Sequence, residues 1–243
     1  RDSYIATGHY CDAGEEDGFP VLLKAADENK DQTYFLNQVS TDQLRRVMFP
    51  LGRMLKPEVR RIAEQNGLVT AKKKDSTGIC FIGERKFRAF LSEYLPGQKG
   101  RIVDTHGKTV GEHFGLMYYT LGQRKGLGIG GRRESLFILA TDTAQNVIYV
   151  GEGDAHPGLW RPALHIAPGE IHWVNPARAL SPGQSARFSV RIRYRQPLQD
   201  ATLFMRDQGA YILFDQPQRG ITPGQFAAWY DGDELVGSGV ISE

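Results

Sequence analysis

The sequence predicts three successive parts: an α/β segment, a small α+β segment and a C-terminal all-β barrel. A strand at residues 4–7 ends on a glycine, and helical patterns follow as far as residue 95, which indicates an α/β arrangement. From residue 136 onward, short alternating apolar runs are separated by turn residues, a pattern typical of a closed barrel or sandwich. We place the three parts at residues 1–82, 83–135 and 136–243.

Strands and helices alternate in the first part. Strands are expected at residues 4–7 and 19–26, separated by an acidic loop at 12–18, and helices at 30–39, 40–49 and 57–66. The last of these helices has proline in its first turn and Gly67 after its end. Helical periodicity predicts that Tyr34, Phe35 and Val39 are available for the buried face of the first helix. On the last helix it predicts a buried stripe of Val59, Ile62 and Ala63.

The middle of the chain is predicted to contain one clear helix and several short strands. The helix covers residues 84–95, and its apolar stripe is assigned to the core: Phe87, Phe90, Leu91, Tyr94 and Leu95. Short strands are expected at residues 68–71, 100–103 and 117–121. A glycine-rich loop then carries Arg124 and Lys125, and backbone amides together with cations suit a phosphate backbone. This loop lacks the GxxxxGK[ST] pattern of a Walker loop.

The last part consists of short strands, among them LFILA, VIYVG, ARFSVRIRY, ATLFMR and AYILF. The tripeptide Pro-Gly-Gln occurs at residues 182–184 and again at 223–225, each time before a predicted strand. This spacing of turns favours a small barrel.

The composition is that of an ordinary soluble globular protein, with 40% hydrophobic and 24% charged residues among 243. No apolar run approaches the ~20 residues of a membrane span and no signal peptide is present, so we expect a cytoplasmic protein without a membrane partner. Two cysteines cannot form a disulfide framework, which indicates a reducing cytosol. The six histidines show no HxxxH or HExxH spacing and the two cysteines lie far apart, so we expect no bound metal.

The chain opens on Arg1, which fits a truncated or processed product.

The charge is unevenly distributed, although the net charge is only +2. Residues 53–133 hold 17 Lys and Arg against 7 Asp and Glu, while the remainder holds 13 against 21. Such segregation indicates a surface that binds a polyanion. A solvated surface without a ligand explains the same numbers equally well.

Cys80 is the residue most suited to covalent chemistry. A cysteine reacts as its thiolate, which nearby cations favour, and Gly78 permits a turn that would present the sulfur. The surrounding cations are Lys72, Lys73, Lys74, Arg85 and Lys86. Taken alone, a cysteine between isoleucine and phenylalanine is more often a buried core thiol, and that interpretation stays open.

Motifs along nearly the whole chain resemble those of the bacterial tRNA 2-thiouridylases. They are ATGHY at residues 6–10, KDQTYFL at 30–36, FPLG at 49–52, the Cys80 motif, LGQRKGL at 121–127, RYR at 193–195 and TPGQ at 222–225. The family's SGGxDS phosphate loop and first catalytic cysteine, which normally precede ATGHY, are absent from this sequence, so it looks like the C-terminal two-thirds of such an enzyme and incomplete for catalysis. By this resemblance the α/β part is a remnant of a nucleotide-alpha-hydrolase-like domain.

The resemblance implies roles for individual residues. Cys80 would carry the sulfur as a persulfide, and the backbone of Gly8 would lie near ATP, with Mg²⁺ expected beside it. The residues implied to contact tRNA are His9, Lys30, Asp31, Gln32, Arg193, Tyr194 and Gln225. Candidates for contacts with the RNA backbone are Lys72, Lys73, Lys74, Arg124 and Lys125. Without the family, Asp31 would be interpreted as a helix cap and Tyr194 as a barrel side chain.

The implied reaction is ATP-dependent thiolation at C2 of the wobble uridine in the tRNA anticodon loop. A protein sulfur relay would deliver the sulfur, and the complete enzyme would be monomeric. One alternative is a non-catalytic RNA-binding module built on the basic residues and the barrel. Another is a thiol-redox protein that uses Cys11 and Cys80, which is disfavoured because the two cysteines do not form a CxxC motif.

Overall fold

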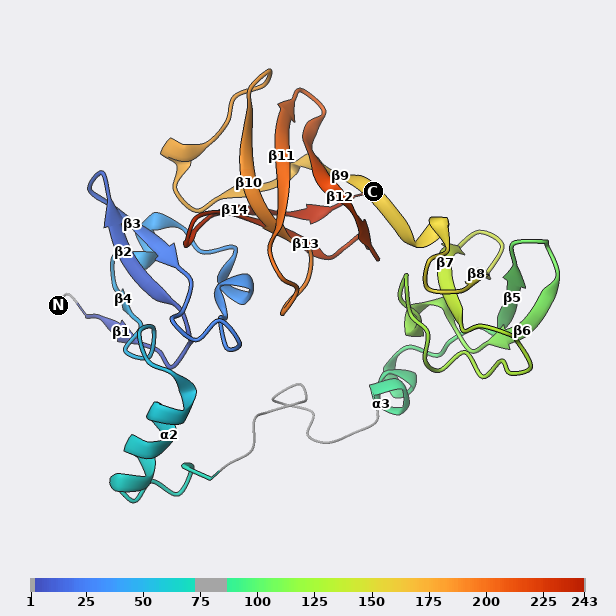
Figure 1. Cartoon of the computed structure of the whole chain (residues 1–243), viewed down its shortest axis with the longest axis horizontal. Helices are drawn as coiled ribbons and strands as arrows, with labels where there is room; N and C mark the ends of the chain where they lie inside the picture. The colour runs from blue at the N-terminus through green and yellow to red at the C-terminus, as the bar shows by residue number, and fades with distance from the viewer. Residues whose placement is uncertain (1–2, 73–86, 243) are drawn as a thin grey trace. The chain divides into compact units, whose positions relative to one another are not determined.

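The computed structural model describes residues 3–72 and 87–242, and the chain divides into two compact units (Figure 1). Of the described residues, one unit holds 3–72, 162–216 and 223–242, and the other holds 87–161 and 217–222. The first and last parts expected from the sequence therefore belong to the same unit. Their association is what builds the candidate site described below.

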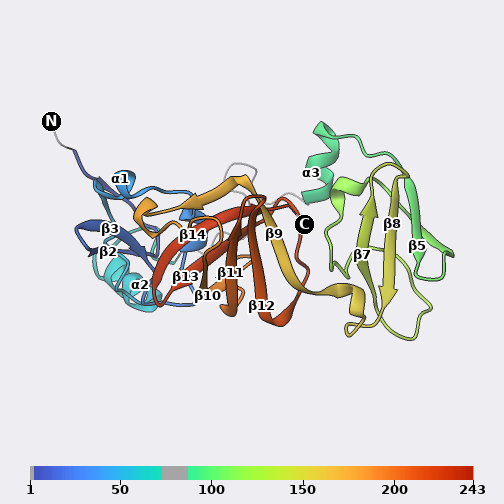
Figure 2. The same cartoon turned by 90° about the horizontal axis from the view of Figure 1, so that it is seen from above.

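A closed barrel of six strands forms the centre of the first unit (Figures 1 and 2). Its strands are β9 (Trp160–Trp173), β10 (Ser185–Arg191), β11 (Gln199–Arg206), β12 (Gly209–Arg219), β13 (Phe226–Asp231) and β14 (Glu234–Ile241). They follow the order β13-β10-β11-β12-β9-β14, and β13 also pairs with β14, which closes the ring. Alternate residues point inward, as on β11, where Ala201, Leu203 and Met205 are buried. The predicted C-terminal barrel is confirmed.

Glycines permit the turns and close approaches that the barrel needs. Both Pro-Gly-Gln turns hold their glycine in the left-handed region, with φ of 91° at Gly183 and 83° at Gly224. On β14, a Cβ atom at Gly237 would lie 2.6 Å from the carbonyl oxygen of His172 and 2.7 Å from the ring of Trp229. A larger residue at Gly237 would therefore push β14 away from β9.

A hairpin from the N-terminal segment extends the barrel sheet. Its strands β2 (Asp12–Glu16) and β3 (Phe19–Leu23) are joined by Asp17 and Gly18, both with positive φ, as a two-residue hairpin turn requires. Strand β3 then pairs antiparallel with β14. The loop expected at residues 12–18 is therefore a strand and a tight turn, and it connects the two ends of the sequence.

The rest of the N-terminal segment up to residue 48 consists of short strands and helical turns. Strands β1 (Ile5–Ala6) and β4 (Val47–Met48) form a two-stranded parallel sheet. Helix α1 (Thr41–Leu44) begins with a capping box, because Ser40 Oγ accepts the Gln43 amide and the Gln43 side chain accepts the Ser40 amide. The helix expected from residue 40 or 41 is confirmed, but it ends before β4 rather than at Pro50.

Residues 30–39 do not form the expected helix. Only a single 3₁₀ turn, η1 (Thr33–Leu36), is present. Its start is held by Asp31, whose carboxylate accepts the backbone amides of Ala25 and Thr33. Side-chain acceptors of this kind compete with the helical hydrogen-bond pattern, which explains the short turn.

The other two helices are found, but their apolar stripes are less covered than periodicity predicted. In α2 (Lys56–Gln65) no residue is buried, and Ile62 is exposed. In α3 (Phe87–Tyr94), Tyr94 is 67% exposed and the following Leu95 is also exposed. Helical periodicity identifies a stripe but not its partner, so the burial assigned to Ile62, Tyr94 and Leu95 is wrong. The burial assigned to Phe87 and Leu91 lies outside what the structure describes. Residues 68–71, expected as a strand, form a turn.

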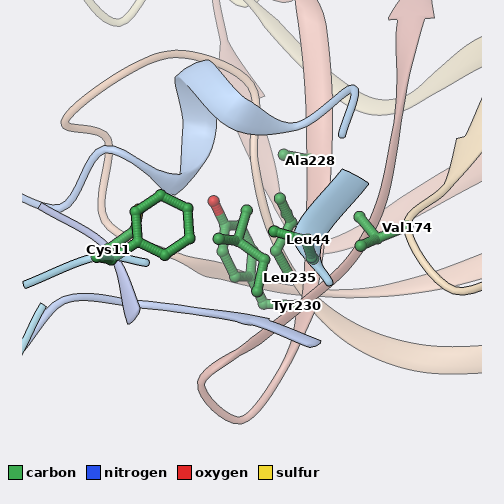
Figure 3. Packing of buried hydrophobic residues seen from close by; sticks show 8 residues of the cluster. Cys11, Leu44, Val174, Ala228, Tyr230 and Leu235 are labelled. Atoms are coloured by element: carbon green, nitrogen blue, oxygen red, sulfur yellow. The ribbon is translucent and has the colours of Figure 1, made fainter. Parts of the chain in front are cut away.

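One buried cluster joins the N-terminal segment to the barrel (Figure 3). It unites Cys11 and Leu22 of the hairpin region with Leu44 of α1 and the barrel residues Val174, Ala228, Tyr230 and Leu235. Burying such side chains stabilises the unit by roughly 1.5–3 kcal/mol for each large one. This shared core holds the segment in one orientation on the barrel.

The second unit contains a separate sheet of four strands in the order β6-β5-β8-β7. They are β5 (Gly100–Asp104), β6 (Thr109–His113), β7 (Leu136–Asp142) and β8 (Val147–Glu152), with short 3₁₀ turns η2 (Leu116–Tyr118) and η3 (Pro157–Leu159). Strand β8 pairs in parallel with β5, which places β7 and β8 in this sheet and not in the barrel. We therefore move the boundary expected at residue 136 to the start of β9. The strand expected at residues 117–121 is replaced by η2 and a turn.

Arg178, at the end of η4 (Pro176–Arg178), ties the hairpin to the barrel. Its guanidinium lies 3.3 Å from Glu16, 3.1 Å from Glu234 and 2.6 Å from Asp231. Glu234 is buried, and this burial, together with a hydrogen bond to Glu16, raises its pKa to about 7 despite the opposing charge of Arg178.

This shift predicts a stability that depends on pH. The folded state holds a proton on Glu234 that the unfolded state has released between about pH 4.5 and about pH 7. The contribution of Glu234 is therefore full below its unfolded pKa and is lost as pH rises through the folded value. In denaturant titrations across this range, Glu234→Gln should flatten the decline seen in the wild type. Glu15→Gln, at an exposed carboxyl of the same hairpin, should not. Identical slopes for wild type and Glu234→Gln would contradict the assignment.

No helix within residues 3–72 and 87–242 is long and apolar enough to cross a membrane. Over the same residues, no group of three His, Cys, Asp or Glu side chains is arranged to hold a metal ion.

Candidate nucleic-acid interface

Asp31 fastens the segment at residues 30–36 to the barrel. It is only 3% exposed, and its Oδ2 accepts a hydrogen bond from Arg191 Nη1 at 3.1 Å. The hydroxyl of Thr33 donates to the same carboxylate at 3.0 and 2.9 Å. These protein donors occupy the carboxylate and give it a positioning role in the turn, while the contact with tRNA implied for Asp31 stays a prediction.

Two tyrosine hydroxyls also connect the segment at residues 30–36 to strand β13 of the barrel. The hydroxyl of Tyr230 lies 3.0 Å from Thr33 Oγ1, and the Arg191 guanidinium lies 5.0 Å from the centre of the Tyr230 ring. Burial raises the pKa of Tyr230 to about 12 and also raises the pKa of Tyr34. The Tyr34 hydroxyl donates to the carbonyl of Phe226 at 2.9 Å. Both tyrosines are therefore neutral structural anchors.

Phe35 lies beside Tyr34, with the two ring centres 6.1 Å apart and the planes at 75°. Its ring centre lies 4.4 Å from that of Tyr194, with the planes tilted by 44°, and Phe35 is 58% exposed. The sequence placed Phe35 on an inner helical face, which is wrong because the segment is a 3₁₀ turn with three residues per turn. No local pattern in the sequence marked Phe35 as a functional residue. Its contact with Tyr194 of the barrel loop is the observation that singles it out.

Gln32 connects the same segment to the ATGHY motif. The Gln32 amide donates to the carbonyl of Tyr10 at 2.7 Å, and the Tyr10 amide donates to Gln32 Oε1 at 2.9 Å. Two residues earlier, Gly8 is exposed after β1, and a Cβ atom there would meet only Leu51, at 3.9 Å. An open backbone of this kind fits the approach of a nucleotide. His9 is partly exposed, with Nδ1 2.7 Å from Thr7 Oγ1.

The structure thus brings together predicted residues that lie far apart in the sequence. Lys30, Asp31 and Gln32 meet the barrel loop of Arg193 and Tyr194 through the Asp31–Arg191 and Phe35–Tyr194 contacts. Gln225 stands next to Phe226, the acceptor of the Tyr34 hydroxyl, and its own carbonyl accepts the Ile241 amide. We call this group the composite surface, defined by residues 30–35, 193–195 and 225.

Arg124 and Lys125 lie in the second unit, on a loop organised by Gln123. Gln123 Oε1 accepts the Thr120 amide at 3.0 Å, and its Nε2 donates to the Lys125 carbonyl at 2.8 Å. Gly122 and Gly126 flank the two cations with φ of 76° and 87°. Arg124 and Lys125 are both exposed, as a contact with phosphate requires. The basic stretch at residues 53–133 is divided between the two units.

Cys11 is an inert thiol. It is fully buried, and burial together with the nearby charges of Asp31 and Asp12 raises its pKa to about 12. The thiol-redox interpretation needs a reactive Cys11 and is therefore contradicted. Lys72 is exposed after α2, whereas Cys80, Lys73 and Lys74 lie outside the described residues.

Models of protein families match almost the whole chain. Residues 1–84 match a tRNA methyl transferase HUP domain, residues 88–152 a tRNA methyl transferase PRC-barrel domain, and residues 165–241 an aminomethyltransferase beta-barrel domain. The first match includes the ATGHY and KDQTYFL motifs, and the last includes the barrel loop of Tyr194.

Individual relatives agree with these matches. The chain is 47% identical over 276 residues to the tRNA-specific 2-thiouridylase MnmA of Christiangramia forsetii, covering 98% of the chain and 70% of that protein. It is 52% identical over 241 residues to MnmA of Pseudomonas aeruginosa and 50% identical over 244 residues to MnmA of Streptococcus mutans. These alignments cover 98% of the chain, but only 63% and 64% of the two relatives. The chain belongs to the tRNA-specific 2-thiouridylase family.

Proposed function

We propose that this protein takes part in thiolation of the wobble uridine of tRNA at C2, and that its composite surface binds the anticodon loop. The observation that carries the proposal is the meeting of the segment at residues 30–35 with the barrel loop at residues 193–195. The family resemblance assigns both stretches to tRNA, and the fold holds them on one unit. The relatives named as tRNA-specific 2-thiouridylases support the same substrate.

In this proposal, ATP supplies adenylation of the uridine C2 oxygen, which turns it into a leaving group. In this chain Gly8 offers an open backbone after β1 for the nucleotide, whereas the neighbouring His9 is assigned to the RNA. Cys80 would carry a persulfide received from a protein relay, and its terminal sulfur would attack C2 while AMP leaves with the former C2 oxygen. A second thiolate, from the cysteine that the family carries ahead of ATGHY, would then attack the inner sulfur of Cys80 and break the S–S bond. The outer sulfur stays on the uridine, and the two cysteines are left as a disulfide for later reduction; alternatively, the second thiolate releases hydrosulfide from the persulfide beforehand, and the hydrosulfide attacks C2.

The sulfur chemistry demands that the uridine leave its stack. Unstacking costs only a few kcal/mol and least in a single-stranded loop, which suits the anticodon loop as the substrate.

The alternative function, a non-catalytic RNA-binding module, needs only the composite surface and the loop of Arg124 and Lys125. Acceptance of sulfur by Cys80 distinguishes the two.

Reversing the charge of the second unit's loop is expected to weaken tRNA binding. Arg124→Glu with Lys125→Glu should lower the affinity at least about 10-fold at about 50 mM salt, because neutralised phosphates release counterions. The wild-type affinity itself should fall steeply between about 50 and about 200 mM salt, and the double variant should show a shallower slope. Fluorescence anisotropy with labelled tRNA measures both.

A charge-preserving exchange, Arg124→Lys with Lys125→Arg, serves as the control and should retain most of the affinity. Binding that ignores salt, or that survives the double reversal unchanged, would remove this loop from the proposed interface.

A further inference from the structure

Phe35 is an apolar ring that the fold leaves at the surface. A single exposed phenylalanine is unremarkable, but this one contacts Tyr194 at 4.4 Å, and the Arg195 guanidinium lies 5.2 Å from the Tyr194 ring centre. Two aromatic rings and a cation therefore form one patch. The patch has one half from the N-terminal segment and the other from the loop after β10, so it exists only in the folded unit.

Both halves of the patch are held in place. The Phe35 amide donates to the Gln32 carbonyl at 3.0 Å, and in a 3₁₀ turn residues three apart lie on the same side, so Phe35 stands above Gln32. In the barrel loop, Arg195 adopts a left-handed φ of 63°, which is uncommon for a residue with a side chain. The Gln196 side chain fixes this loop by accepting the Ile192 amide at 2.9 Å. A rigid platform loses little entropy when a ligand stacks on it.

The charges beside the patch favour a nucleic acid over a protein partner. Arg193 and Arg195 are exposed cations on either side of Tyr194, and the carboxylate of Asp31 is buried and paired with Arg191. Glu28 and Asp233 line the same cavity as Arg195, so the cations outside that cavity are the ones available to a phosphate. Aromatic rings bordered by cations are the usual means of holding unpaired bases, since each base has a face to stack and a phosphate to neutralise.

We propose that Phe35, together with Tyr194, is a stacking platform for one unpaired base of the bound RNA. This inference rests on the proposed function and adds to it a residue and a mode of recognition. The side-chain oxygen of Gln32 accepts the Tyr10 amide, which ties the turn that carries Phe35 to the ATGHY motif.

The test compares the affinity of the whole chain for two RNAs. One is an anticodon-arm hairpin with 2-aminopurine in its loop, and the other is a blunt duplex of the same length. Phe35→Ala should weaken binding of the hairpin by about 5- to 150-fold, the range that follows from the stacking energy of one base, and leave binding of the duplex unchanged. Wild-type protein should quench the 2-aminopurine fluorescence, and Phe35→Ala should not.

Matched variants separate stacking from loss of structure. Phe35→Trp should keep the affinity and the quenching, and Phe35→Leu, which keeps apolar bulk, should still lose the quenching. Tyr211→Ala is the control, since Tyr211 is 39% exposed and stacks on His165 at 4.6 Å elsewhere on the barrel. It should bind the hairpin as the wild type does.

Each outcome decides the matter. Wild-type binding of the hairpin with no loss in Phe35→Ala would overturn the platform and leave the proposed function standing. An equal loss in Tyr211→Ala would overturn the platform as well. Failure of the wild type to bind either RNA would overturn the proposed function together with the platform.

Discussion

A persulfide donor is expected to add the mass of one sulfur atom to the peptide that contains Cys80 and to no other peptide. The thiolate of Cys80 would take the outer sulfur of the donor's persulfide, and the donor would leave as a thiolate, so sulfur and electrons balance. Lys72 to Lys74 precede Cys80 in the sequence and Arg85 follows it, and cations close to a thiol favour its ionised form. Cys11 cannot compete, because its pKa of about 12 leaves almost no thiolate at neutral pH.

Peptide mass spectrometry after incubation with the donor measures this result. The increment should vanish in Cys80→Ser and persist in Cys11→Ser, which is the matched control. An increment on Cys11 alone would show that the sulfur carrier is misassigned. An unlabelled Cys80 would favour the non-catalytic RNA-binding alternative.

Removal of the Asp31 carboxylate is expected to destabilise the first unit by about 3–5 kcal/mol. Asp31→Ala leaves the Arg191 guanidinium charged and buried without its partner, and an uncompensated buried charge is far more costly than a lost surface contact. The effect is increased because Arg191 Nε already has no hydrogen-bond partner among the described residues. Denaturant unfolding followed by the fluorescence of Trp173 and the buried Trp229 reports on this unit.

The chain contains a matched pair at the surface of the same barrel. Arg187 and Asp215 form a bidentate contact at 2.6 Å, but both side chains are about half exposed. Asp215→Ala should therefore cost no more than about 1 kcal/mol, although its hydrogen bonds are shorter than those of Asp31. Equal destabilisation by the two substitutions would contradict the view that burial decides the effect. Because Asp31 holds Thr33 in the turn that also carries Phe35, Asp31→Asn should weaken RNA binding more than Asp215→Asn.

Local patterns predicted the parts of the structure that depend on near neighbours. The alternation of Ala201, Leu203 and Met205 identifies β11, and the helix expected from residue 40 begins there as α1. Motif order along the chain identified the family without any structure. Each of these features is encoded within a few residues, because strand alternation, helix caps and turns are formed by groups adjacent in sequence.

The candidate site was different, because its contacts join distant residues. Asp31 and Arg191 are 160 positions apart, and the pairing that closes the site cannot be deduced from either stretch alone. Local pattern turned Phe35 inward and left the direction of Asp31 open, whereas the folded unit exposes the ring and buries the carboxylate. Side-chain periodicity determines which residues share a face. Only the tertiary structure decides what covers that face, since burial depends on whichever segment packs there from elsewhere in the chain.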